Sequence, residues 1–171
     1  MADNATPNKL VRRNQWASFM NTGTSEQETY SLMGDGFTQL AESKNPKEYS
    51  RQYVNMATEA TDVVGYAPAI AYTVDVYSGD PCIKKIMEIT DNEYVGSDAQ
   101  VSIVNVNLWT GTEGSREATR RKYAVIPDGK GDGTDALVLT GNFKAVGDQE
   151  KGTFNETTKT FTPATAAAGT T

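Results

Sequence analysis

The chain has 171 residues, which is enough for one domain with a core of its own. Only 37% of the residues are hydrophobic, there are 15 glycines, and the mean hydropathy is -0.53, a composition that favours strands and turns over helices. The formal net charge of -6 argues against a protein that grips nucleic acid, because phosphate binding needs a basic surface.

Residues 1–14 are polar, carry Arg12 and Arg13, and are coil by composition. We expect them to form an N-terminal arm that becomes ordered only when neighbouring subunits hold it. They contain no apolar run typical of a signal peptide, and no stretch of the chain is long and apolar enough to predict a membrane span. A strand carrying Trp16, Phe19 and Met20 is predicted over 15–22.

The next segment predicts a long hairpin over residues 34–55, GDGFTQLAESKNPKEYSRQYVN. Two stretches of period two, 37–42 and 49–54, flank SKNPK, which has the composition of a turn. Neither face is apolar enough to bury itself, and an isolated two-stranded hairpin is marginal in water. We therefore expect it to protrude and to lie against neighbouring subunits. Its aromatic residues Phe37, Tyr49 and Tyr53 would be the interface anchors, although they could instead belong to the core of the subunit itself.

One helix is predicted in the middle of the chain. Asp80 is a good N-cap, and Pro81 suits the first helical position. Ile83, Ile86 and Met87 then form one apolar stripe, and the helix should end near residues 90–92.

Strands are predicted on both sides of this helix, and several have apolar residues on both faces, which is typical of a sandwich or a partly closed barrel. The fold class is therefore mainly β, with one flanking helix and the protruding hairpin. The domain would span 15–162, followed by a polar C-terminal tail over 163–171. The remaining strands are predicted over 69–77, 99–109, 117–126, 136–146, 152–154 and 160–162.

The sequence offers little for catalysis. It contains no histidine, so we expect neither a histidine-based catalytic dyad nor a histidine metal ligand, and no enzymatic activity or cofactor is predicted. Cys82 is interpreted as a buried structural thiol. The aspartate-rich run 127–135 lacks the ligand spacing of a calcium loop and is interpreted as a turn between strands.

Four basic residues form the one basic cluster of the sequence. They are Arg116, Arg120, Arg121 and Lys122, and their alternation along a strand splits them between two faces. Carboxylates of another subunit are as good a partner for them as phosphate.

The order of these elements resembles the major tail tube protein family of long-tailed bacteriophages. The resemblance covers residues 30–163 and lies in the segment 34–55, the helix after SGDPC, and two further pieces, VVGYAPAIAYTVDVY and GNFKAVGDQEKGTFNETTKTFTP. It implies a β-sandwich or barrel with one helix, assembled as hexameric rings that stack into a tube through which DNA is ejected. It brings no catalytic residues.

The resemblance further implies the partners and the location. The chain would contact copies of itself and the tail terminator, tape measure and baseplate proteins, would assemble in the host cytoplasm, and would end in the tail of the virion. Arg12, Arg13, Phe37, Tyr49 and Tyr53 are then candidate interface residues. DNA would pass a wall enriched in the surplus carboxylates without binding to it, and no membrane would be involved.

Two other functions stay open. A β-sandwich binding module, for carbohydrate or adhesion, would need exposed tryptophans or a calcium site, and only Trp16 and Trp109 are available. A small hydrolase that uses carboxylates is weakened by the absence of histidine.

Overall fold

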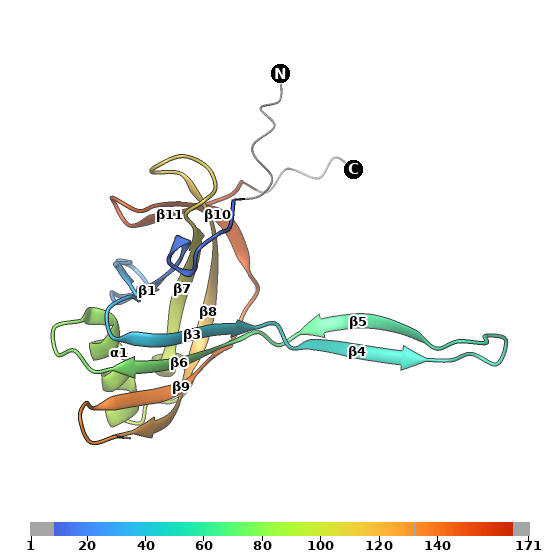
Figure 1. Cartoon of the computed structure of the whole chain (residues 1–171), viewed down its shortest axis with the longest axis horizontal. Coiled ribbons are helices and arrows are strands. Elements are labelled where there is room, and N and C mark those ends of the chain that lie inside the picture. Colours follow the sequence, from blue (N-terminus) through green and yellow to red (C-terminus); the bar gives the residue numbers. More distant parts are fainter. Residues whose placement is uncertain (1–8, 132, 166–171) are drawn as a thin grey trace.

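A computed structural model describes residues 9–131 and 133–165 and shows a mainly β protein with one α-helix (Figure 1). Nine strands form one antiparallel sheet in the order β2-β1-β7-β8-β9-β6-β3, with the β10–β11 hairpin attached to β8, and β4 and β5 form a separate ribbon. The elements are η1 (Arg13–Gln15), β1 (Trp16–Asn21), β2 (Tyr30–Leu32), β3 (Phe37–Ser43), β4 (Pro46–Arg51), β5 (Ala60–Tyr66), β6 (Ala69–Asp75), α1 (Pro81–Asp91), η2 (Gly96–Ala99), β7 (Gln100–Asn107), β8 (Arg116–Lys130), β9 (Val138–Ala145), β10 (Glu150–Asn155) and β11 (Thr160–Pro163).

The longest strand, β8, holds the sheet together by pairing with three others. One edge of β8 pairs with β7. The other edge pairs with β10 up to Arg120 and with β9 from Tyr123 onward. The sheet therefore branches at Arg121 and Lys122, where β8 exchanges one partner for the other.

This branching gives two separate hydrophobic clusters. The larger one packs α1 against β6, β7, β8 and β9, and the smaller one lies beneath β10 and β11. Strand β7 contributes to both, since Val101 and Ile103 belong to the larger cluster and Val104 and Val106 to the smaller. Its predicted two-sided apolar pattern is thereby explained, and the prediction of a mainly β, partly closed sandwich is confirmed.

The helix forms as its sequence predicts. The Asp80 side chain accepts a hydrogen bond from the Ile83 amide at 3.0 Å, Pro81 occupies the first turn, and Asn92 is the C-cap. Ile83 and Ile86 are buried beside Cys82 in the larger cluster. Among the described residues, no helix is long and apolar enough to cross a membrane.

The predicted hairpin over 34–55 is wrong in its pairing. Strand β3 pairs with β6, and β4 pairs with β5, a strand that the sequence analysis did not predict. The two ladders follow one another along a single ribbon, because Ala67 and Asn45 face each other where they join, with the Ala67 amide 3.1 Å from the Asn45 oxygen. The SKNPK segment is therefore a kink with Asn45 at φ 44°, and the chain reverses only over 52–59.

The outer half of this ribbon projects from the body, and no other described part of the chain lies beside it (Figure 1). We call residues 46–66, which comprise β4, β5 and their connection, the arm. The protruding hairpin is thus present, but it begins where the predicted turn lies.

The predicted terminal segments are described only in part. Residues 1–8 of the N-terminal arm and 166–171 of the C-terminal tail lie outside the described residues. Within the described part, Arg13 belongs to the short η1 turn that leads into β1, and β11 extends as far as Pro163.

Three buried ionisable groups of the core predict that the free energy of unfolding falls at alkaline pH. Burial raises the pKa of Tyr72, Tyr123 and Cys82 to about 12 each. The unfolded chain releases these protons near pH 9–10, before the folded chain does, so the free energy of unfolding should fall between about pH 9 and 12. The full slope is about 1 kcal/mol per pH unit for each group.

Urea unfolding of the parent and of Tyr72→Phe across this pH range measures the effect. The variant should show a shallower decline, since one of the three groups is gone. A free energy of unfolding that stays constant from neutral pH through this range would contradict the assignment.

Candidate assembly surfaces

One face of the arm carries a preformed cluster around Arg51. Its guanidinium lies 5.3 Å from the ring centre of Tyr49 and 5.7 Å from that of Tyr53, and its Nε donates to the Tyr53 hydroxyl at 2.9 Å. The same guanidinium pairs with Asp62, which stands opposite Tyr49 in the ladder. The hydrogen bond with Asp62 is the main cause that raises the pKa of Arg51.

This cluster exists because of strand geometry. Tyr49 and Arg51 are two residues apart on β4 and so share a face, and the register puts Asp62 beside them. The opposite face of the arm has a hydrogen bond between the Ser50 and Thr61 hydroxyls at 2.8 Å. The two faces of the arm therefore differ in chemistry, and the aromatic and charged one has the composition of interface hot spots.

The arm leaves several large apolar and aromatic side chains exposed to solvent. Six large apolar or aromatic residues are more than half exposed there: Tyr49, Tyr53, Val54, Val63, Val64 and Tyr66. A two-stranded ribbon has no core in which to bury them, so these side chains are available to another surface.

The three predicted aromatic anchors do not lie together. Tyr49 and Tyr53 are on the arm, whereas Phe37 begins β3 in the body and packs, partly buried, against the larger core cluster. The packing of Phe37 favours its alternative role in the core of the subunit. An interface role for the two tyrosines stays a prediction.

Arg13 holds the beginning of the chain onto the body. Its guanidinium donates to the Trp16 carbonyl at 2.8 Å and to the Leu40 carbonyl of β3 at 3.2 Å, and it lies 5.0 Å from the Trp16 ring centre. It therefore bridges β1 and β3, which border an open groove of about 460 Å³. The Arg12 amide bonds the Gln15 side chain at 2.8 Å, and its own side chain is exposed.

Two strands end the main path of the sheet and offer a free edge each. They are β2, with three residues, and β3, with seven. Free edges present unpaired amides and carbonyls to which another chain can add. On β3, the Leu40 carbonyl is already taken by Arg13.

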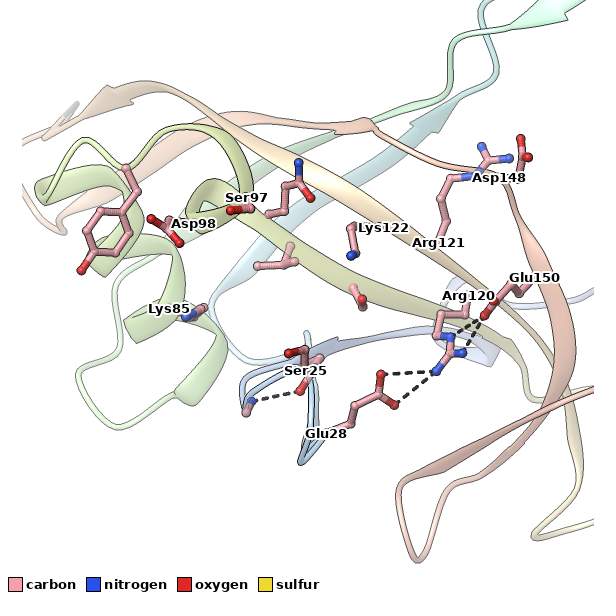
Figure 2. A pocket seen from close by; sticks show the side chains of 16 residues that line it. Ser25, Glu28, Lys85, Ser97, Asp98, Arg120, Arg121, Lys122, Asp148 and Glu150 are labelled. Carbon is pink, nitrogen blue, oxygen red and sulfur yellow. Dashed lines mark hydrogen bonds and ion pairs between the residues drawn. The ribbon is translucent and has the colours of Figure 1, made fainter.

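A second surface is a polar groove of about 950 Å³ at the branch point of β8 (Figure 2). We call it the β8 groove. It is bordered by the loop after β1, by α1 and η2, by β7 and β8, and by the connection between β9 and β10. Its charged lining residues are Glu28, Lys85, Asp98, Arg120, Arg121, Lys122, Asp148 and Glu150, four of each sign.

Two members of the predicted basic cluster are neutralised within the subunit. Arg120 contacts Glu28 at 3.2 Å and Glu150 at 2.6 Å, and its guanidinium lies 4.6 Å from the ring centre of Phe161. Arg116 pairs with Glu156 at 3.1 Å. These two arginines therefore find their carboxylates in their own chain rather than in another subunit.

The residues considered for chemistry have ordinary structural surroundings. Cys82 is fully buried, and its thiol donates to the Ser31 carbonyl at 3.4 Å. In the run 127–135, residues 127–130 still belong to β8, so the predicted turn toward β9 begins only after Lys130, with residue 132 outside the described part. Within the described ranges, no three histidine, cysteine or acidic residues are grouped as metal ligands would be.

The Arg51–Asp62 pair and the β8 groove were not predicted from the sequence. Both depend on which strands pair, and alternation along a strand does not reveal its partner. The only available signal for β5 was its β-branched content, Thr61, Val63 and Val64.

Comparison with known proteins adds little to this description. No protein-family model matches the sequence, and no curated protein matches it. Among solved structures, the chain is similar to one in the "Cryo-EM structure of the anti-feeding prophage (AFP) baseplate, 6-fold symmetrised", with a TM-score of 0.48 and 9% identity over 86% of this chain and 96% of that chain. A likeness at this level carries no functional weight.

The different positions of the aromatic residues predict different effects on stability. Phe37→Ala should lower the free energy of unfolding of the dilute subunit by about 1–3 kcal/mol, because it removes a partly buried side chain from the core. Tyr49→Ala combined with Tyr53→Ala should change it by less than about 1 kcal/mol, since both side chains are exposed. Urea titration checks both, and equal losses would contradict this division.

Proposed function

We propose that this chain is a structural protein of a bacteriophage tail tube, which assembles as hexameric rings that stack around a channel for DNA. The single observation that carries the proposal is the arm, a projecting ribbon whose exposed tyrosines and valines are not covered by any described part of the chain. The resemblance of residues 30–163 to the tail tube family supplies the kind of assembly.

The preformed state of the arm supports a role in binding. Arg51 already holds Tyr49 and Tyr53 in place through one hydrogen bond and two cation–π contacts. Side chains fixed before association lose less conformational entropy when a partner covers them. The arm is thus suited to repeated, specific contact with a rigid neighbour, which a stacked tube provides.

The free sheet edges supply a second kind of contact. Closed rings need a surface that continues from one copy to the next, and strand edges can provide it while removing an aggregation hazard. We assign lateral contact to the edges of the sheet and contact between rings to the arm. The neighbouring tail proteins would be the tail terminator, tape measure and baseplate proteins, and the tube would form in the host cytoplasm and remain in the virion.

The proposed role is mechanical and involves no catalysis. The surplus of acidic residues, 22 against 16 basic ones, would be biased toward the channel wall. Repulsion between like charges would let DNA slide, and salt would screen it.

A binding module is the alternative, and the exposed aromatic residues bear on it. Trp109 is 45% exposed, while two of the arm's exposed tyrosines, Tyr49 and Tyr53, cluster on Arg51. Such a cluster suits a protein surface as partner.

Assembly tests the proposal directly. The parent chain at increasing concentration should form rings and tubes visible by negative-stain electron microscopy. Tyr53→Ala should raise the concentration needed by about tenfold or more, because hot-spot truncations cost about 2 kcal/mol. Tyr77→Ala is the matched control, since Tyr77 is 58% exposed against 56% for Tyr53 and lies outside the arm. Monomers at every concentration would refute self-assembly, and equal effects of both variants would remove the arm from it.

The channel makes a separate prediction about DNA. Preformed tubes should not retain double-stranded DNA at physiological salt, because an acidic wall repels phosphate. Co-sedimentation of labelled DNA with tubes measures this. Retention that weakens as salt is added would indicate a basic wall and contradict the proposal.

A further inference from the structure

The arm is attached to the body through a short joint between two ladders. The β3–β6 ladder ends at the facing residues Ser43 and Ala69. The β4–β5 ladder begins at Pro46 and Tyr66, and Figure 1 shows it continuing away from the body. We call the four residues between the ladders the joint: Lys44, Asn45, Ala67 and Pro68. Both strands of the ribbon pass through the joint, so the bonds that cross it set the direction of the arm.

Two hydrogen bonds between Asn45 and Ala67 cross the joint. In a regular antiparallel ladder, a hydrogen-bonded pair of residues exchanges two bonds between backbone amides and carbonyls. Here the Ala67 amide donates to the Asn45 carbonyl at 3.1 Å, but the bond back to the Ala67 carbonyl comes from the Asn45 side-chain Nδ2 at 3.0 Å. We call these two bonds the clasp. The side chain of Asn45 thus replaces a backbone amide.

The backbone at the joint explains why a side chain takes this part. Asn45 has φ 44°, in the left-handed region that asparagine tolerates better than most residues. A residue before proline is normally restricted to extended conformations, and Pro46 follows Asn45 directly. An unfavourable backbone conformation persists only where surrounding contacts hold it. The clasp supplies such contacts.

We propose that Asn45 is a positioning residue that fixes the direction of the arm relative to the body through the clasp. Its effect on assembly rests on the proposed function. A partner binds only those subunits whose arm points in the required direction, so the apparent affinity falls with the fraction of such subunits. The body side of the joint is itself anchored, because the Pro68 carbonyl accepts a hydrogen bond from the Ala145 amide of β9 at 2.9 Å.

The distance between two spin labels tests the clasp in the dilute subunit, where assembly plays no part. One label is attached at Glu59→Cys, an exposed position at the outer end of the arm's ladder, and the other at Lys84→Cys, exposed on α1. Cys82 is fully buried and should stay unlabelled, which the mass of the labelled chain verifies. Double electron–electron resonance should give one narrow distance distribution for the subunit with Asn45 intact.

Two variants remove the side-chain donor in different ways. Asn45→Gly keeps the left-handed backbone free of strain and deletes the side chain, whereas Asn45→Asp keeps its shape and presents a carboxylate to the Ala67 carbonyl. Both should broaden the distance distribution and deplete the parent distance. Lys44→Ala is the matched control, since it changes the neighbouring residue of the joint and removes only an exposed ion pair with Glu42. It should leave the distribution unchanged.

Urea unfolding separates positioning from a purely structural role. The joint lies outside both hydrophobic clusters, so both Asn45 variants should unfold at nearly the urea midpoint of the parent. Variants that lower the midpoint while the folded subunit keeps the parent distance would make Asn45 merely structural and overturn the proposal. Variants that do not fold at all would overturn it for the same reason.

Tube formation connects the joint to assembly. The concentration needed for tubes should rise as the fraction of subunits with the parent distance falls, by about tenfold where about one tenth of them keep it. Unchanged distances in both variants overturn the proposal whatever the tubes do, and broadened distances with unchanged tube formation remove the joint from assembly. A parent chain that never forms tubes refutes the proposed function and leaves the distance test of the clasp intact.

Discussion

Strand β8 is the constraint on which the rest of the structure depends. Because β9 and β10 both pair with the same edge of this one strand, the sheet must diverge at Arg121 and Lys122. The divergence creates two clusters in place of one, and it forces β7 to bury both of its faces. The buried hydrophobic side chains are thereby divided between two small cores, and the branch leaves the β8 groove on the surface.

The arm depends on the body in a different way. Its ladder continues the pairing of β3 with β6, so the outer ribbon begins with its two strands already in register. The β3–β6 pairing therefore already covers most of the entropic cost of bringing the two strands of the arm together. That pairing is held in the body, where Tyr72 and Val74 of β6 are buried. A ribbon that would be marginal alone can project because its base is fixed, and Arg51 with Asp62 then orders its outer half.

The sequence predicted local features well and pairing poorly, and the reason is physical. The cap at Asp80, the stripe at Ile83 and Ile86, and the two-sided pattern of β7 are all set by neighbours in the chain, and all are found. The partner of β3 is set by distant residues, and alternation is the same whichever strand pairs with it. SKNPK has the composition of a turn, but the chain does not reverse there. The positive φ of 44° at Asn45 instead accompanies a kink within one ribbon. In the candidate site, the tyrosines could be predicted from the sequence because aromatic residues are common at interfaces. The role of Asp62 and the position of the groove could be recognised only once the strand register was known.

Under the proposed function, the arm and the β8 groove would offer a partner two different kinds of surface. In the arm, every charge of the central cluster is neutralised and the apolar groups are exposed, which suits contact driven by burial. The β8 groove is more polar, because four acidic and four basic residues line it and the buried Nε of Arg121 has no acceptor among the described residues. Apolar contact supplies affinity without much direction, while a charge pair in a confined groove fixes register and rejects a misplaced neighbour. Under the proposed function, a subunit adds to a growing tube in one orientation, and it would need both kinds of contact.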